Sequence, residues 1–117
     1  LDVLEHLINP WEAVRKLDRF LNPGGQLIIS VPNVQNYHVI FDLIFRGSFK
    51  YTESGIMDRT HLRFFTRHTA VELAESAGAR VTDSVGTESF RWQKRLLSAL
   101  GLGNFLAKQF LIAATKP

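Results

Sequence analysis

The sequence contains no cysteine, so it can form neither a disulfide framework nor a thiolate metal site. It has no apolar run of the roughly 18 residues that a membrane span requires, and no signal-peptide pattern is visible. We therefore expect a cytoplasmic protein with no stable membrane insertion. The net charge is only +3 and the Lys and Arg residues are scattered, so we expect no nucleic-acid partner.

The composition is that of one small globular domain. The chain has 117 residues, of which 45% are hydrophobic and 21% charged. It begins with an apolar pattern, Leu-Asp-Val-Leu, and without a methionine. We therefore expect this sequence to be a piece of a longer protein.

Residues 22–33 organise the rest of the chain. An Asn-Pro-Gly-Gly turn leads into the apolar run 26–31, which is typical of a strand buried on both faces. Pro32 cannot donate a backbone hydrogen bond, so it marks the end of the strand. Ligands of open α/β sheets bind beyond the carboxyl ends of strands, and we expect function to begin at Pro32 and Asn33.

Turn and capping residues predict helices on either side of this strand. Asn9 and Pro10 are typical of a helix start, and Val14 should face the core. Thr66 can cap a second helix, for which Thr69 with Glu72 offers an alternative start as a capping box. The apolar stripe of that helix contains mostly small residues, namely Ala70, Leu73, Ala74 and Ala77.

Two more strands and two further segments complete the pattern. We expect strands over residues 80–85 and 105–115 and an amphipathic segment over 90–100. Residues 39–45 form a dense apolar patch, which predicts a short helix ending near Gly47. This helix is either buried against the sheet or a lid over a substrate pocket lined by Tyr37, Phe49 and Tyr51.

Three motifs in a fixed order carry a family resemblance. They are Leu-Asp-Val-Leu-Glu-His-Leu at residues 1–7, the stretch 22–33, and Asp-Arg-Thr-His-Leu-Arg-Phe-Phe-Thr at residues 58–66 before a helix that ends with Ala-Gly. Together they resemble class I S-adenosylmethionine-dependent methyltransferases, most closely the type 11, 12 and 23 methyltransferase domains. The resemblance covers nearly the whole chain and is less clear after Thr87.

The resemblance implies an α/β fold, a truncated Rossmann-like sheet with flanking helices. Residues 1–4 would be the end of the fourth strand of that sheet and residues 26–31 the fifth. Residues 80–85 would be the sixth strand, and residues 105–115 the seventh, which inserts antiparallel between the fifth and sixth. Residues 1–117 would then be the C-terminal portion of one methyltransferase domain, without the glycine-rich cofactor loop. The chain alone should bind S-adenosylmethionine weakly or not at all.

The resemblance also implies a cofactor site at the start of the chain. Leu4, Glu5 and His6 would lie beside the methionine and adenosine portions of S-adenosylmethionine, although Glu5 and His6 could instead only cap and solvate a helix entry. Asp2, Glu5 and His6 echo a pattern that implies a metal in some quinone-biosynthetic relatives. Three positions so close in sequence are a weak metal signal, and we predict no metal site.

His61 is the candidate catalytic base. An imidazole titrates near neutral pH and could take a proton from a substrate hydroxyl. Asp58 could orient His61, and Arg63 could hold a carboxylate or phosphate of the substrate. Alternatively, His61 and Arg63 only tie a loop to the sheet. Tyr37 and Asn33 complete the candidate substrate set, although Asn33 could simply shape the turn after its strand.

The leading hypothesis is methyl transfer from S-adenosylmethionine to an oxygen of a small molecule, glycan or lipid-linked sugar, as in bacterial polysaccharide pathways. The alternative is a non-catalytic methyltransferase-like binding module. Nucleic-acid methylation is disfavoured, because the chain reads Leu-Glu-His-Leu where amino-methylating enzymes carry Pro-Pro-Tyr or Pro-Pro-Phe. An unpaired edge of the strand 26–31 would favour a homodimer, unless residues 1–7 cover it.

Overall fold

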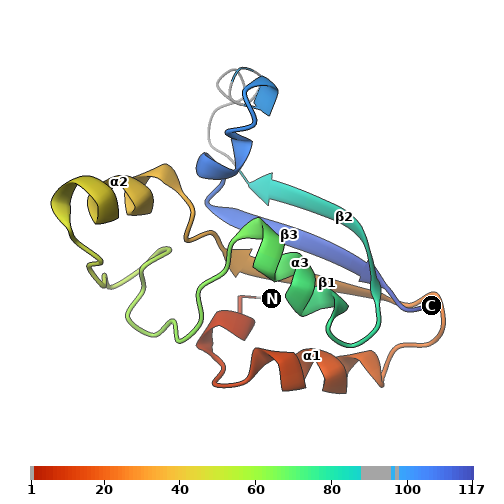
Figure 1. Cartoon of the computed structure of the whole chain (residues 1–117). Coiled ribbons are helices and arrows are strands. Elements are labelled where there is room, and N and C mark those ends of the chain that lie inside the picture. Colours follow the sequence, from red (N-terminus) through yellow and green to blue (C-terminus); the bar gives the residue numbers. More distant parts are fainter. Residues whose placement is uncertain (1, 88–95, 97) are drawn as a thin grey trace.

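The computed structural model describes residues 2–87, 96 and 98–117, and these form a three-stranded sheet with helices packed on it (Figure 1). The strands are β1 (Gln26–Pro32), β2 (Arg80–Thr87) and β3 (Gln109–Thr115). Their order in the sheet is β1-β3-β2, and β3 runs antiparallel to both neighbours. The last strand of the chain therefore joins the other two.

The core lies between the sheet and two helices, α1 (Pro10–Asp18) and α3 (Arg67–Glu75). Side chains alternate across β3, so Phe110, Ile112 and Ala114 point into the core. The small side chains of α3 allow this helix to pack against all three strands, as Figure 1 shows. Val14 of α1 is also buried, as its sequence position predicts.

Both predicted helix starts are confirmed. The Asn9 side chain accepts a hydrogen bond from the Glu12 backbone N–H, so it caps α1. The Thr66 side chain accepts from the Thr69 backbone N–H, and the Thr69 hydroxyl accepts from the Thr66 backbone N–H, which completes a capping box. The alternative start at Thr69 is therefore wrong, because that residue already lies inside the helix.

Three sequence predictions about other segments need correction or lie outside the described residues. Asp2 and Val3 form a turn and Leu4–His6 a 3₁₀ helix, η1, so residues 2–4 are not the end of a strand. A strand needs a paired neighbour, and this segment instead closes on itself through the His6 N–H and the Val3 carbonyl. Residues 103–105 are a second 3₁₀ helix, η2 (Gly103–Phe105), and the last strand begins only at Gln109. The amphipathic segment 90–100 lies mostly outside the described residues.

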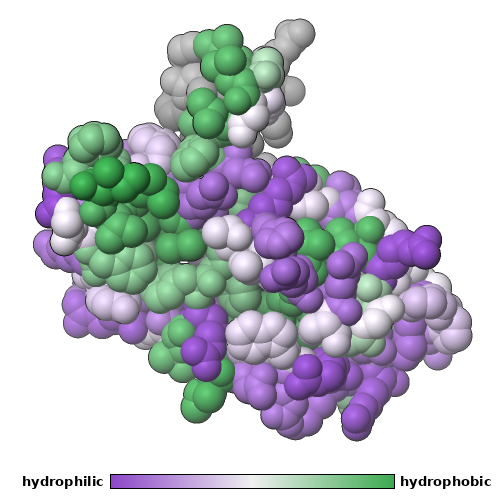
Figure 2. Space-filling model, in the orientation of Figure 1, coloured by the Kyte–Doolittle hydropathy of each residue, from purple (hydrophilic) through white to green (hydrophobic). Residues whose placement is uncertain are grey.

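The helix α2 (Tyr37–Arg46) forms where the apolar patch predicts it and ends at Gly47, whose φ is +59°. None of its residues is buried, so the prediction that it packs against the sheet is wrong. Its exposed apolar side chains form a surface that we call the α2 surface, consisting of Tyr37, Phe41, Leu43, Ile44 and Phe45. Figure 2 shows hydrophobic side chains gathered on the lobe of the molecule that contains α2.

The outer edge of β1 pairs with no strand among the described residues. The segment before α1 does approach it, because the Ser30 hydroxyl donates to the Asp2 carboxylate at 2.8 Å. This is a side-chain contact and leaves the strand edge without a ladder, so dimerisation through this edge stays a prediction. Across the described part of the chain, helices are too short or too polar to cross a membrane.

Candidate functional site

Two segments far apart in sequence meet at the candidate site. The backbone carbonyl of Glu5 in η1 accepts hydrogen bonds from the N–H groups of Leu62, at 2.7 Å, and Arg63, at 3.0 Å. The Arg63 guanidinium also donates to the Ile8 carbonyl. These contacts dock the loop 58–63 onto η1 and thereby bring His61 to Glu5 and His6.

The side chains of Glu5, His6 and His61 form one cluster, which we call the Glu5 cluster. One ligand atom from each residue lies within 4.8 Å of the others. The two imidazole rings meet edge to face with centroids 4.8 Å apart. The His6 Nε2 atom lies 4.0 Å from the Glu5 Oε1 atom. The sequence predicts separate roles for these residues, and the structure brings them together.

Backbone carbonyls fix the proton position on both rings. The His6 Nδ1 atom lies 3.1 Å from the Thr60 carbonyl, and the His61 Nδ1 atom lies 2.9 Å from the Ile56 carbonyl. A carbonyl oxygen can only accept, so each Nδ1 carries the proton. In the neutral form, both Nε2 atoms therefore keep a free lone pair.

Glu5 is the most deeply buried member of the cluster. Its exposed fraction is 1%, and its Oε2 atom has no hydrogen-bond partner. An unpaired buried carboxylate is costly unless a charge or a metal ion compensates it. His61 is also buried, whereas His6 reaches the surface. In the cluster, the buried Glu5 carboxylate thus lies beside the His6 imidazole, which is exposed to solvent.

Asp58 does not orient His61 as the sequence suggested. The Asp58 Oδ1 atom accepts from the Thr60 hydroxyl at 2.6 Å and from the Thr60 N–H at 2.8 Å. The hydrogen bond from the Thr60 hydroxyl has the larger effect and the one from the Thr60 N–H the smaller. Together they hold the pKa of Asp58 below its usual value. The Ile56 carbonyl takes the orienting role, and because any residue supplies a carbonyl, no sequence signal could have identified it.

The other residues predicted for the site do not belong to the Glu5 cluster. The Leu4 side chain is part of the hydrophobic core, so only its backbone could face a cofactor. The Asn33 side chain donates to the Asn104 and Ala107 carbonyls and accepts from the Gln35 N–H, all at 2.7–2.9 Å. These bonds support the interpretation that Asn33 shapes the turn. Tyr37 lies on the α2 surface, half exposed.

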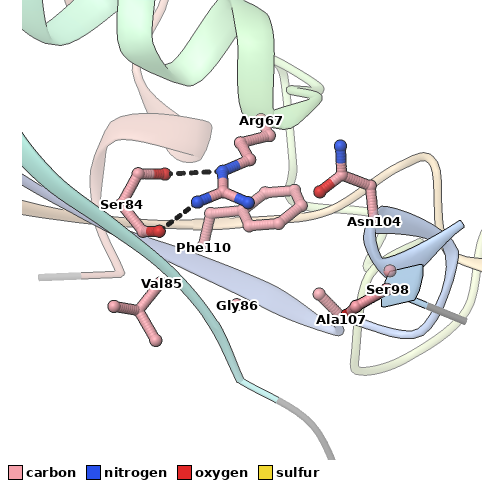
Figure 3. Close-up of a pocket in the computed structure, with 9 residues that line it drawn as sticks. Arg67, Ser84, Val85, Gly86, Ser98, Asn104, Ala107 and Phe110 are labelled. Carbon is pink, nitrogen blue, oxygen red and sulfur yellow. Dashed lines mark hydrogen bonds between the residues drawn. The ribbon is translucent and has the colours of Figure 1, made fainter. Parts of the chain in front are cut away.

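A separate cavity of about 270 Å³ lies between α3, β2 and the segment before β3 (Figure 3). Its lining includes Arg67, Ser84 and Asn104, and it shares no residue with the Glu5 cluster. The Arg67 guanidinium donates to both the hydroxyl and the carbonyl of Ser84, so its charge is already held by the protein. No sequence motif marks the lining of this cavity, so it could not be predicted from the residues.

Comparison with known proteins identifies a family. A family model described as a methyltransferase domain matches residues 1–84, which is more than half of the chain. The matched span contains all three residues of the Glu5 cluster. No curated protein matches the chain.

Proposed function

We infer the function from one premise: this chain belongs to the methyltransferase domain family. We propose that the protein carrying it transfers a methyl group from S-adenosylmethionine to an oxygen of a small molecule, a glycan or a lipid-linked sugar. The single observation that carries this proposal is the family match over residues 1–84. We further propose that the reaction takes place in the cytoplasm.

We propose that the chain is the C-terminal portion of a methyltransferase domain. In this assignment β1, β3 and β2 are the fifth, seventh and sixth strands of the family sheet. The antiparallel position of β3 between the other two supports it. The 117 residues contain no Gly-x-Gly-x-Gly sequence. Most of the cofactor contacts, which backbone N–H groups of such a loop provide, would then come from outside these residues.

Titration with S-adenosylmethionine tests this proposal. The 117-residue chain should show no saturable binding in the micromolar range, whereas a protein extended upstream to include a glycine-rich loop should bind the cofactor there. A micromolar Kd for the chain alone would overturn the assignment. If the coding sequence upstream of Leu1 encodes no such loop, the proposal of methyl transfer fails as well.

The residues of the cluster have distinct roles in the proposed reaction. The sulfonium C–S bond breaks as the acceptor oxygen bonds to the methyl carbon, and the hydroxyl proton leaves to a base. We assign the cofactor side to Glu5, His6 and the Leu4 backbone, and the acceptor side to His61. The free Nε2 of His61 supports its role as the proton acceptor. Because Arg63 already donates to Ile8, a role in holding the substrate is retained only for its remaining N–H groups.

The α2 surface supports an acceptor with an apolar portion. Phe45, with 73% of its surface exposed, should lose contact area when replaced by serine. We expect Phe45→Ser to raise KM about tenfold with kcat unchanged, because burial of a large apolar side chain contributes about 1.5–3 kcal/mol. Steady-state kinetics of the cofactor-competent protein measures this. Phe20→Ser, which alters a phenylalanine that is 86% exposed and lies outside the α2 surface, is the matched control.

The α2 surface also favours the alternative function, a non-catalytic binding module. In that case the apolar side chains would bind a protein partner and no methyl group would move. The two functions differ in the effect of Phe45→Ser, which would alter partner binding while S-adenosylmethionine had no measurable affinity for any form of the protein. Transfer of a labelled methyl group to any acceptor would exclude the alternative.

A further inference from the structure

We propose that Glu5, His6 and His61 bind a divalent first-row cation of the Zn²⁺ type. The three residues supply two imidazole nitrogens and one carboxylate. Two histidines and one carboxylate are a ligand set of catalytic zinc and of non-haem iron sites, in which further positions stay open for water or substrate. The inference rests on the geometry of the cluster and holds whether or not the protein transfers methyl groups.

The proton positions of the two histidines match those of metal ligands. Metal-bound histidines almost always donate their second ring N–H to a carbonyl or carboxylate, which fixes the ring orientation. His6 and His61 each donate Nδ1–H to a backbone carbonyl and keep Nε2 free. The Thr60 carbonyl belongs to the docked loop, and the Ile56 carbonyl lies just before it. These two backbone groups thus hold both rings before any ion is present.

The distances between ligand atoms allow a cation to close the site. Tetrahedral ligands bound at about 2.1 Å lie roughly 3.4 Å apart. The Glu5 Oε1 and His6 Nε2 atoms are 4.0 Å apart, and all ligand atoms lie within 4.8 Å. Closing the site therefore requires shifts of about 1 Å. The partly exposed His6 side chain can make such a shift, whereas the Glu5 side chain is buried and has less room to move.

The charge of Glu5 is the second, independent argument. Its Oε2 atom is buried and has no partner, and among the described residues its only ion-pair contact is with His6. A buried charge is tolerated when it is paired or coordinates a metal. A divalent cation bound between Glu5 and the two Nε2 atoms would satisfy this carboxylate. No lysine or arginine in the described part of the chain does so.

The ligand types also predict which cations bind. Imidazole suits Zn²⁺, Co²⁺, Ni²⁺ and Fe²⁺, whereas Mg²⁺ and Ca²⁺ prefer oxygen ligands. At an open position, the bound cation would lower the pKa of a water or substrate hydroxyl. His61 Nε2 would then be a ligand, and proton removal from an acceptor would fall to the cation. Without the cation, the imidazole itself is the available base.

Titration of the 117-residue chain with Co²⁺ and Zn²⁺ tests the site. We expect one-to-one binding with a micromolar or tighter Kd and visible Co²⁺ absorption bands that Zn²⁺ abolishes. His6→Ala should weaken binding at least about tenfold, and because His6 is exposed, the variant should fold normally. Glu5→Gln and His61→Ala should have larger effects, with circular dichroism confirming that each variant is folded. His68→Ala, which removes an exposed histidine paired with Glu72, is the control and should change nothing.

Three results would overturn the proposal. The first is a millimolar Kd for both ions. The second is equal affinity for Mg²⁺ and Zn²⁺, which would exclude imidazole ligands. The third is an unchanged Kd in His6→Ala together with a weakened Kd in His68→Ala, which would place the ion on α3.

Discussion

Replacing Leu73 with alanine should lower the free energy of unfolding by about 3–4 kcal/mol. Leu73 lies in α3 with 0% of its surface exposed and is part of the core formed with β3. Truncating a fully buried leucine costs the lost transfer free energy and leaves a cavity, and such substitutions range over about 2–5 kcal/mol. Because small domains are stabilised by only about 5–15 kcal/mol in total, the urea midpoint should fall clearly.

Leu43→Ala is the matched control for this prediction. Leu43 also lies inside a helix, α2, but is 45% exposed and does not belong to the buried core cluster. The change in helix propensity is the same in both variants and therefore cancels. We expect Leu43→Ala to change stability by at most about 0.5 kcal/mol. Equal losses in the two variants would mean that α2, and not only α3, is buried in the folded protein.

Local sequence signals predicted the elements of this fold well. Asn9 and Thr66 cap their helices, and Gly47 ends α2 in the left-handed conformation, because each of these preferences acts within a few residues. The alternation of side chains along β3 likewise follows from strand geometry. What failed was the packing of α2, because an apolar patch looks the same in sequence whether it is buried or exposed.

The candidate site was predictable only in part, for a related reason. Glu5 and His61 were both identified as functional residues, but 56 positions separate them and no local pattern predicts their contact. The contact depends on the Glu5 carbonyl, which accepts from Leu62 and Arg63. Backbone groups are present at every residue, so docking through them leaves no trace in the residue types. The same holds for the carbonyls that orient both imidazoles.

Replacing His61 with alanine should reduce methyl transfer by about 10²–10⁴-fold in the cofactor-competent protein. This is the contribution typical of a positioned general base. His61 is 9% exposed, and its Nδ1 proton is held by the Ile56 carbonyl, so Nε2 is the ring nitrogen left free to accept a proton. Steady-state kinetics with the true acceptor measures this loss.

Two comparisons decide what His61 does. His68→Ala removes an exposed histidine of α3 and should leave the rate unchanged. A loss of less than about tenfold in His61→Ala would exclude a direct role in proton transfer, and the histidine would then only dock the loop 58–63.

If the rate does fall, treatment with a chelator distinguishes a role of His61 as a base from a role as a metal ligand. An imidazole that acts alone keeps the wild-type protein active after chelation, whereas a metal ligand does not. In the second case added Zn²⁺ should restore the wild-type rate but not that of His61→Ala, because the variant lacks one of the three ligands.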